Sequence, residues 1–274
     1  MKQKVWLITG VSKGLGREIA KQVVESGNIV IGTVRTVEDK EAFESDFDAK
    51  AHIIDLSKTD RIGLLIEEII QQYGRIDVLV NNAGYGAFGM IEEFEESEII
   101  RQFNVNFIAV WKLCKTVLPH MREKGEGVIV QISSSLGVLA GAGNGIYASS
   151  KFALEGMSEA LKKEVEPFGI KVLLIEPGAL RTDFLGESIA YARKEISQYE
   201  KRITSIRTDT KAFNGKQLGN PVKATKLIIE AVDSNASSFR LPLTSGAIEA
   251  INAKIIDLKN CIDLSENAAS TVDY

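Results

Sequence analysis

The sequence contains few of the residues on which metal sites, disulfide frameworks and Ser-His hydrolases depend. Its 274 residues include only two cysteines, Cys114 and Cys261, and two histidines, His52 and His120. Two cysteines this far apart argue against a disulfide framework and favour a reducing, cytoplasmic setting. Neither histidine has a nucleophile or a metal-ligand cluster beside it in the sequence, so we expect structural or surface histidines and no metal site.

Long apolar runs and a strong charge imbalance are missing as well. The sequence has no apolar run of about 18 residues, the length that marks a membrane span, and its first apolar run is too short for a signal peptide. The net charge of −4 does not provide the basic face that nucleic-acid binding requires. An apolar share of 45% and a charged share of 26% are ordinary for a globular protein. We therefore expect a single domain over residues 1–274.

Short apolar runs alternate with stretches of helical spacing over most of the chain. This alternation predicts βαβ units, and hence a parallel sheet with helices on both faces. We expect an α/β fold of three layers, a doubly wound Rossmann-type sheet of about seven strands. The predicted strands are residues 5–9, 29–34, 51–55, 78–81, 128–133, 171–175 and 239–241, and the predicted helices are residues 15–26, 61–73, 97–122, 147–166 and 221–233.

The pattern changes after Asp183. Residues 184–220 are charged, with scattered aromatic side chains, and contain no predicted strand. A long insertion after the C-terminal end of a strand, where α/β sheets bind ligands, is typical of a substrate lid. The alternative is a solvated helical excursion with no contact to a ligand.

The C-terminal segment predicts a helical extension over about residues 245–264. Apolar residues recur at Ile248, Ile251, Ile255 and Leu258, which is the spacing of a one-faced amphipathic helix. The residues after Ser265 are small and polar, and we expect them to be frayed.

A glycine-rich turn follows the first predicted strand, with glycines at Gly10, Gly14 and Gly16. A sharp turn from strand to helix favours residues without a Cβ atom, which also let the backbone approach a pyrophosphate. The next helix then points its free N–H groups at the phosphates. The turn predicts a dinucleotide site, although its spacing is GxxxGxG and not GxGxxG.

The second predicted strand ends in Val34-Arg35 and carries no acidic residue at its tip. NAD-binding folds often place an acid there to bond the ribose hydroxyls. An acid would repel a 2′-phosphate, whereas Arg35 can hold one through charge-assisted hydrogen bonds. Lys13, inside the glycine turn, can add a second positive charge. These two side chains predict NADP(H) as the cofactor.

Tyr147 and Lys151 form the single YxxxK pair in a chain with six tyrosines. A spacing of four residues on a predicted helix places both side chains on one face. The pKa of a free tyrosine, about 10, is too high for acid–base work near neutrality. A nearby ammonium should lower that pKa. The pair therefore predicts a general acid for carbonyl reduction and a general base for alcohol oxidation.

Two further polar residues fit a site around this pair. Ser134 lies 13 residues before Tyr147, at the end of the fifth predicted strand, where its hydroxyl can bond the substrate oxygen. Ser133 and Ser135 are the alternatives for this role. Asn106 lies inside a predicted helix, where asparagine is mildly unfavourable, and we expect it to hold a water that links the lysine to solvent.

These motifs together resemble the short-chain dehydrogenase/reductase family in its form with one Rossmann domain. The resemblance covers about residues 4–183. Residues 9–16 are similar to the family's TGxxxGxG turn, residues 81–84 to its NNAG motif, and Pro177-Gly178 with Thr182 to its PG…T segment. Asn106, Ser134, Tyr147 and Lys151 match its catalytic tetrad. The tail after Arg240 resembles the tails of hydroxysteroid-dehydrogenase-like or uncharacterised members.

The resemblance implies an NADP(H)-dependent oxidoreductase that acts on CH-OH and C=O groups. It implies that Lys151 also binds the nicotinamide ribose and that Asn106 completes a proton relay. The predicted helices 97–122 and 147–166 resemble the family's dimer-forming pair, so we expect a homodimer or a homotetramer. The implied cofactor-binding residues are Gly10, Ser12, Lys13, Gly14, Leu15, Gly16, Arg35, Asp55, Leu56, Asn82, Ala83, Gly84, Tyr147, Lys151, Pro177, Gly178, Leu180 and Thr182.

The candidate substrate residues follow these motifs in the chain and are mostly apolar. They include no arginine pair that could receive a carboxylate or a phosphate. We therefore predict a hydrophobic ketone, aldehyde or secondary alcohol, while packing within the core or the lid is the alternative role for each residue. The candidates are Tyr85, Phe88, Leu136, Phe184 and Tyr191, with Met90 and Leu139 beside them.

Two other functions fit the same motifs. A 3-oxoacyl-thioester reductase would share the tetrad, and the basic residues Arg193, Lys194, Lys201 and Arg202 could receive its acyl carrier protein. A protein that senses NADP(H) without turnover would need the cofactor residues but would have no use for Tyr147. An assay of NADPH oxidation against a range of carbonyl compounds separates these functions.

Overall fold

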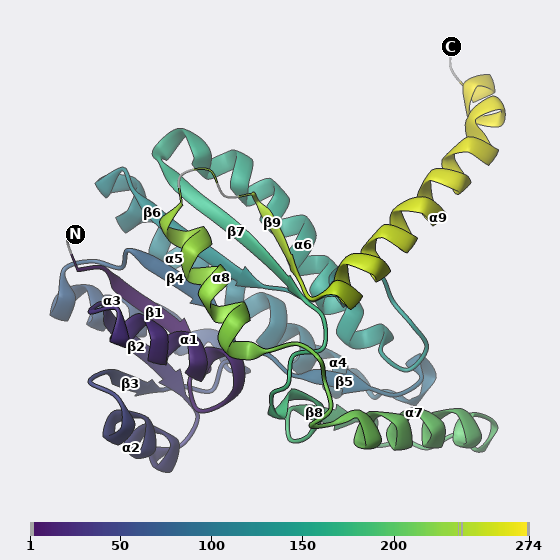
Figure 1. Ribbon diagram of the computed structural model, residues 1–274, viewed down its shortest axis with the longest axis horizontal. Helices are drawn as coiled ribbons and strands as arrows, with labels where there is room; N and C mark the ends of the chain where they lie inside the picture. The colour runs from purple at the N-terminus through teal and green to yellow at the C-terminus, as the bar shows by residue number, and fades with distance from the viewer. Residues whose placement is uncertain (1–2, 235, 237, 273–274) are drawn as a thin grey trace.

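A seven-stranded parallel sheet forms the centre of the computed structural model, which describes residues 3–234, 236 and 238–272 (Figure 1). Its strands are β1 (Val5–Thr9), β2 (Ile29–Val34), β3 (Lys50–Ile53), β4 (Val78–Asn81), β6 (Gly127–Ile132), β7 (Ile170–Pro177) and β9 (Arg240–Leu243). They lie in the order β3-β2-β1-β4-β6-β7-β9, and every neighbouring pair is parallel. The predicted fold class and strand number are confirmed.

The strand order reverses at β1, which has β2 on one side and β4 on the other. Leu7 of β1 is in register with Ile31 of β2 and with Leu79 of β4. The chain turns in opposite directions after these neighbouring strands, which opens a crevice at their carboxyl ends. That crevice is where ligands bind in open α/β sheets, and the glycine-rich turn begins there.

Helices cover both faces of the sheet. The helices of the described chain are α1 (Gly14–Glu25), α2 (Val37–Asp46), α3 (Ile62–Tyr73), α4 (Glu96–Phe103), α5 (Ala109–Lys124), α6 (Gly145–Val165), α7 (Glu200–Phe213), α8 (Pro221–Asp233) and α9 (Ser245–Ala269). One core cluster packs α3, α5 and α6 against the sheet, and a second packs α1, α2 and α8 against the other face.

Alternation along β1 shows how the sequence builds these two cores. All five residues of the strand are buried. Leu7 belongs to the core under α3 and α5, whereas Trp6 and Ile8 belong to the core under α1 and α8, because successive side chains of a strand point to opposite faces. Burying each such side chain contributes about 1.5–3 kcal/mol, so a strand that is apolar throughout is stable only between two helical layers.

The observed elements differ from the predicted ones in two places before β4. The third strand runs over Lys50–Ile53 and not over 51–55. Helix α2 was not predicted, because it is rich in charge and buries only Phe43. Its start is nevertheless marked by Thr36, whose side chain accepts a hydrogen bond from the backbone N–H of Asp39.

The predicted helix over 97–122 has a wider turn in its middle. Helix α4 passes into a π-helical turn at Asn104–Ile108, and α5 continues from it. Such turns are rare and often occur at functional sites. Here the turn contains Asn106, whose side chain is buried at 1% exposure.

The segment after Asp183 contains a strand, contrary to the prediction for residues 184–220. Strand β8 (Ile189–Tyr191) pairs in parallel with β5 (Gly86–Phe88) as a separate two-stranded sheet. Three-residue strands are too short for their alternation to be recognised in the sequence. Helix α7 follows, and Figure 1 shows it beside this small sheet and apart from the central one. We call residues 184–220 the lid segment below, after the role predicted for them from the sequence.

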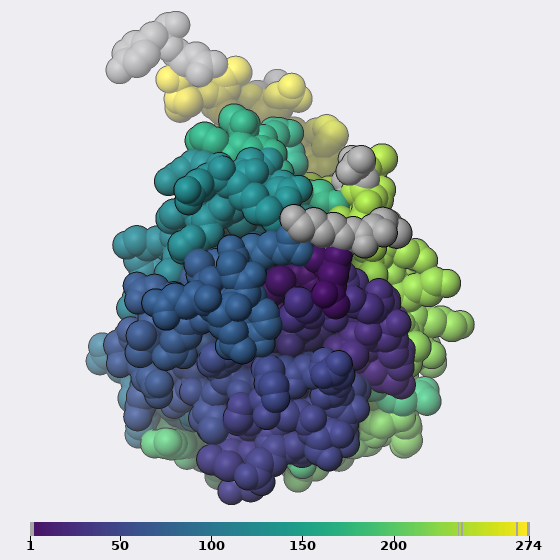
Figure 2. Space-filling view, turned by 90° about the vertical axis from the view of Figure 1, so that its left-hand side faces the viewer, coloured from purple at the N-terminus to yellow at the C-terminus, as the bar shows by residue number. Residues whose placement is uncertain are grey.

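Helix α9 extends away from the rest of the molecule, as Figures 1 and 2 both show. It is longer than the predicted extension and continues to Ala269, so the prediction of fraying after Ser265 is wrong for residues 266–269, while residues 273 and 274 lie outside the described residues. The predicted apolar side chains Ile248, Ile255 and Leu258 lie on its surface. No helix in the described part of the chain is long and apolar enough to span a membrane.

Candidate active site

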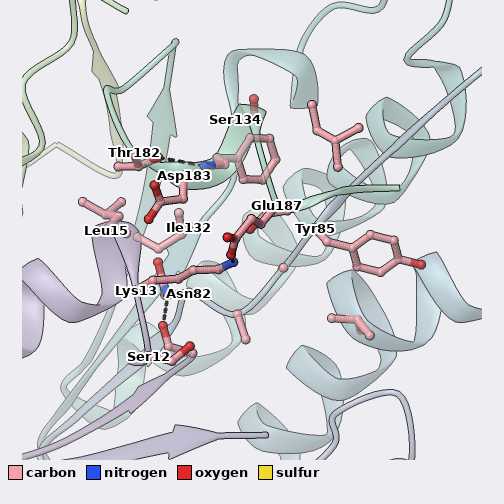
Figure 3. A pocket seen from close by; sticks show the side chains of 18 of the residues that line it. Ser12, Lys13, Leu15, Asn82, Tyr85, Ile132, Ser134, Thr182, Asp183 and Glu187 are labelled. Carbon is pink, nitrogen blue, oxygen red and sulfur yellow. Dashed lines mark hydrogen bonds and ion pairs between the residues drawn. The ribbon is translucent and has the colours of Figure 1, made fainter. Parts of the chain in front are cut away.

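A cavity of about 410 Å³ opens at the carboxyl ends of the central strands (Figure 3). Its lining runs from the glycine-rich turn after β1, past the ends of β2, β4 and β6, to the segment after β7. It includes Gly10, Arg35, Asn82, Tyr147 and Thr182, so one continuous cleft brings together residues from every predicted motif.

The turn after β1 has the backbone conformation that glycine favours. Gly10 has φ 73° and Gly14 has φ 62°, both in the left-handed region. Helix α1 begins at Gly14, and no described side chain caps its first turn. Its backbone N–H groups are therefore available to an anion in the cleft.

Gly16 was predicted to contact the cofactor but lies outside the cleft lining. A Cβ atom there would lie 2.3 Å from both the Gly10 carbonyl oxygen and Asn82 Nδ2. Gly16 therefore allows close packing of the first turn of α1 against the glycine turn.

The Asn81–Gly84 segment ties the end of β4 to the glycine turn. Asn82 Nδ2 donates to the carbonyl oxygens of Thr9 (2.8 Å) and Gly10 (3.1 Å), and the backbone N–H groups of Asn82 and Ala83 donate to Thr9 Oγ1. Gly84 lies between two site residues, since a Cβ atom there would be 3.2 Å from Asn106 Oδ1 and 3.7 Å from Lys151 Nζ.

Two cations lie at the end of the cleft predicted to bind adenosine. Arg35 lines the cleft together with Asp55 and Leu56. Lys13 lines it too, but Lys13 Nζ lies 2.6 Å from a carboxylate oxygen of Glu187 in the lid segment (Figure 3). A cofactor phosphate would therefore compete with Glu187 for Lys13.

Tyr147 is buried at 4% exposure, although it lines the cleft. Its ring packs against Phe184 and Phe88, with ring centroids 5.8 and 6.4 Å away. Burial raises the pKa of Tyr147 to about 12, and a hydrogen bond with Ser134 acts in the opposite direction. The expectation that Lys151 brings this pKa below the ordinary value is wrong for the protein alone, because desolvation of the phenolate dominates.

Lys151 lies one turn beyond Tyr147 on α6, with Nζ 5.9 Å from the centroid of the Tyr147 ring. It donates a hydrogen bond of 2.7 Å to the carbonyl oxygen of Ile132, at the end of β6. Burial lowers the pKa of Lys151 to about 8, while the charge of Glu155 acts to raise it. The ammonium is therefore charged at neutral pH but can lose its proton under mildly alkaline conditions.

Ser134 follows β6 and lines the cleft. Its hydroxyl accepts a hydrogen bond of 3.1 Å from the N–H of Leu136 and so fixes the start of a short 3₁₀ turn. Of the alternatives, Ser133 is turned toward the buried Glu155 carboxylate. Leu136 itself lies outside the lining, so its predicted contact with substrate is not supported by its position.

Asn106 lies behind the cleft wall and joins the π-helical turn to two neighbouring segments. Its Nδ2 donates to the Tyr85 carbonyl oxygen and to Ser150 Oγ, each at 3.1 Å. Its Oδ1 accepts from the Tyr85 N–H at 3.2 Å. Both amide hydrogens are thus used, and a relay water can only donate to Oδ1.

The apolar part of the cleft differs from the predicted one. Tyr85 and Phe184 line it, whereas Phe88 and Tyr191 pack behind them with ring centroids 6.4 Å apart. Met90 and Leu139 also lie outside the lining. Several lining residues were not predicted, since they carry no motif: Thr33, Ile54, Arg101, Val105, Ile132, Ile189 and Ala190.

A partly buried charge cluster outside the cleft lining was also missed. Arg240 of β9 forms ion pairs with Glu155, Glu159 and Glu176. The sequence holds one signal for it, because Glu155 follows Lys151 by four residues and must share its helix face. Among the described residues there is no group of three His, Cys, Asp or Glu that could hold a metal ion. Cys114 and Cys261 are free thiols.

Comparison with known proteins identifies reductases that are similar over about two thirds of this chain. A 3-ketodihydrosphingosine reductase of Bacteroides thetaiotaomicron is 42% identical over 184 residues, which are 67% of this chain and 66% of that enzyme. An NADPH-dependent 3-dehydrocapnine reductase of Ornithobacterium rhinotracheale is 35% identical over 190 residues, 66% of this chain and 67% of that enzyme.

The likeness extends to the whole fold. A solved short-chain dehydrogenase of Streptomyces avermitilis superposes with a TM-score of 0.91 at 36% identity, covering 99% of both chains. The family model described as short chain dehydrogenase matches residues 4–192, which include the glycine turn, the Asn81–Gly84 segment and the Tyr-Lys pair. The chain therefore belongs to the short-chain dehydrogenase family of oxidoreductases.

Proposed function

We propose that this protein is an NADP(H)-dependent reductase of a hydrophobic ketone, with Tyr147 as its proton donor. The observation that carries this proposal is the meeting of Tyr147, Ser134 and Lys151 at one end of the cleft that begins at the glycine turn. The same site can catalyse the reverse reaction on a secondary alcohol.

The cleft residues fit a dinucleotide. The uncapped N-terminus of α1 and the left-handed glycines would hold its pyrophosphate. Lys151, with the segment from Pro177 to Thr182, would hold the nicotinamide end. When bound, the nicotinamide supplies or accepts the hydride.

Proton transfer is the task of the α6 side chains. A phenol whose pKa is about 12 stays protonated at neutral pH, and the alkoxide formed from a ketone is more basic still, so the proton moves favourably from Tyr147 to the substrate oxygen. The Lys151 ammonium then stabilises the phenolate left behind. Ser134, which bonds with Tyr147, would orient the carbonyl oxygen.

The preference for NADP(H) rests on the cations at the other end of the cleft. Arg35 follows β2 where an acidic residue would select NAD(H), and it has no carboxylate beside it in the sequence. Lys13 adds a positive charge once Glu187 releases it. The NADPH-dependent relative supports the same preference.

The substrate that we propose is a long-chain ketone such as a 3-keto amino alcohol. Aromatic and aliphatic side chains, among them Phe184 and Ile189, form the cleft wall beside Tyr147. The names of the two reductases similar to this chain refer to 3-ketodihydrosphingosine and 3-dehydrocapnine. A pocket of this kind gains affinity from each buried methylene, about 0.8 kcal/mol.

A substrate panel tests the proposal and its alternatives. NADPH oxidation would be followed with 3-ketodihydrosphingosine, with a 3-oxoacyl thioester on a carrier protein, and with short ketones. The proposal expects the highest kcat/KM for the long-chain ketone. The highest value for the carrier-bound thioester would favour the acyl-carrier alternative, and tight NADPH binding without turnover of any carbonyl would favour the sensor.

We also propose a homodimer, or a homotetramer built from it, formed through α5 and α6. Trp111 on α5 and Phe152 on α6 are large apolar side chains with 41% and 44% exposure. Sedimentation analysis of Phe152→Glu would show a loss of mass if this surface forms the contact, and an unchanged mass would exclude it.

A further inference from the structure

Helix α6 carries a row of four functional groups at intervals of four residues. Tyr147, Lys151, Glu155 and Glu159 follow one another along the helix, so their side chains share one face. The first two belong to the proposed catalytic site. The third, Glu155, is buried at 6% exposure, and a buried carboxylate requires hydrogen-bond and ion-pair partners.

Two partners hold the Glu155 carboxylate in place. Oε1 accepts a hydrogen bond from Ser133 Oγ, and Oε2 pairs with the Arg240 guanidinium. Gly137 packs closely over this contact, since a Cβ atom there would lie 2.6 Å from Ser133 Oγ and 2.8 Å from Glu155 Oε1. The carboxylate therefore has a single well-defined position.

The carboxylates around Glu155 outnumber the one arginine that pairs with them. Arg240 of β9 is the shared partner of three carboxylates: Glu155 and Glu159 on α6, and Glu176 on β7. Burial, followed by the charge of Glu155, raises the pKa of Glu176 to about 7. A further negative charge in this cluster is therefore unfavourable. The Lys151 ammonium, one turn from Glu155, supplies a second positive charge.

Lys151 depends on Glu155 in turn. The described part of the chain shows no carboxylate in contact with the Lys151 ammonium, whose hydrogen bond goes to the neutral carbonyl of Ile132. The remaining ionisable group facing it is Tyr147, which is neutral in the resting protein. Glu155 is thus the anion that offsets the cost of burying this cation.

Both residues also hold the same strand end. Lys151 bonds to Ile132 and Glu155 bonds to Ser133, while the next residue, Ser134, faces the cleft. The end of β6 is therefore fixed from α6 at two consecutive residues. A change at Glu155 would reach the Ser134 hydroxyl through one peptide unit.

We infer that Glu155 is a positioning residue, whose buried carboxylate keeps the Lys151 ammonium charged and fixes the strand end that presents Ser134. The inference rests on the proposed function for its consequence in catalysis. The effect of Glu155 on the protonation of Lys151 does not depend on the proposed function, because it follows from the packing of α6 against β6, β7 and β9.

The decisive test measures the protonation of Lys151 directly. Protein labelled with ¹³C at the lysine Cε atoms would be titrated by NMR, and Lys151→Arg would assign the signal. Its midpoint near pH 8 should stand apart from the other lysines, whose pKa values are ordinarily about 10.4. Glu155→Gln should move this midpoint down by about one pH unit, because an opposite charge nearby favours the charged form.

Glu159→Gln is the matched control. It removes a carboxylate from the same helix face and the same arginine, but one turn farther from Lys151 and with its side chain 55% exposed. The midpoint should stay within about 0.3 pH units of the wild type, since an exposed charge is screened by solvent. Equal shifts in the two variants would overturn the inference and assign the effect to the cluster as a whole.

Glu155→Gln is expected to fold, because Arg240 keeps Glu159 and Glu176 as partners. Glu155→Asp provides a second variant, which keeps the carboxylate on a side chain that is one methylene shorter. The Lys151 midpoint should fall less in this variant than in Glu155→Gln. An unchanged Lys151 midpoint in both variants would refute the inference.

Activity gives a separate readout. If a carbonyl substrate is reduced, the alkaline limb of kcat should fall at lower pH in Glu155→Gln than in the wild type or in Glu159→Gln. A shifted Lys151 midpoint in a protein that reduces no carbonyl would refute the proposed function and leave the charge coupling intact. An active enzyme in which the Lys151 midpoint is unshifted would refute the charge coupling and leave the proposed function intact.

Discussion

On the sheet side of the cleft the charged groups Lys151 and Glu176 are buried, whereas Glu187 and Glu195 of the lid segment lie largely in solvent. Lys151 and Glu176 have exposures of 5% and 2%. In the lid segment, the Glu187 side chain that meets Lys13 is 80% exposed, and Glu195, which pairs with Arg207, is 70% exposed. Both sides carry ion pairs, but the free energy that is lost when a pair is broken differs between them.

This difference matches the two tasks that we propose for the site, proton transfer and ligand binding. A buried charge that loses its partner costs several kcal/mol, so the sheet side keeps one geometry and suits proton transfer. Exposed pairs contribute about 0.2–1 kcal/mol each, so lid residues can exchange one partner for another as ligands enter. Chemistry should therefore be sensitive to substitutions on α6, and binding should be only mildly sensitive to substitutions in the lid.

The largest effect is expected for Tyr147→Phe. Loss of the phenolic proton should lower kcat by about 10²- to 10⁴-fold, while the Kd for NADPH should change little. Stopped-flow turnover and fluorescence titration measure the two quantities. Tyr85→Phe, at a second tyrosine that lines the cleft, is the control and should lose far less; a similar loss in both variants would remove Tyr147 from its proposed role.

The cofactor preference should respond to Arg35→Asp. Replacing a cation by an anion at the predicted 2′-phosphate position should shift the ratio of kcat/KM for NADPH to that for NADH toward NADH, by about 10- to 100-fold for an interaction of 1.5–3 kcal/mol. Arg193→Asp makes the same charge change on the lid, where the side chain is 73% exposed, and should leave the ratio unchanged. No shift with Arg35→Asp would exclude this arginine as the phosphate ligand.

The pH profile tests the buried side without a substitution. Since burial lowers the pKa of Lys151 to about 8, the ammonium is present below that pH and is lost as the pH rises through it. Carbonyl reduction should be nearly constant from pH 6 to 7 and then fall about tenfold per pH unit once the pH is above about 8. A flat profile up to pH 10 would show that Lys151 keeps its proton or that its charge is not needed.

The smallest effect is expected for Glu187→Gln. Removing this carboxylate frees Lys13, so the affinity for NADPH should rise about two- to fivefold, the range that an exposed ion pair allows. The affinity for NADH, which has no 2′-phosphate, should stay the same. Glu195→Gln, a lid carboxylate paired elsewhere, is the control, and weaker NADPH binding in Glu187→Gln would show that Glu187 assists the cofactor instead of competing with it.

The sequence was sufficient to predict the cleft residues whose type and spacing are dictated by a dinucleotide and a carbonyl group. A glycine turn, a Tyr-Lys pair on one helix and a strand-end serine each follow from what a dinucleotide and a carbonyl require, and the structure places Gly10, Tyr147 and Ser134 in one cleft. The buried strands were predictable for a similar reason, because runs such as Val5–Thr9 are apolar throughout.

The remaining features depend on contacts that no local pattern records. The β5–β8 pairing, the Lys13–Glu187 ion pair and the Arg240 cluster each join segments far apart in the chain. The rise in the Tyr147 pKa also depends on distant segments, because they bury the side chain. The spacing in the sequence shows that Lys151 is near Tyr147 but not how far Tyr147 is shielded from water. Helix α2 was missed because a single buried residue, Phe43, leaves no periodic pattern.

The β5–β8 pairing also has a consequence for the order of folding. Its two strands are separated by β6, α6 and β7, so they can meet only after the central sheet has brought the chain back to the same edge. Closing so long a loop is entropically costly and slow compared with forming adjacent βα units. We expect amide protons of β8 to gain protection from exchange last during refolding, so the part of the cleft that Ile189 and Ala190 line would form after the glycine turn.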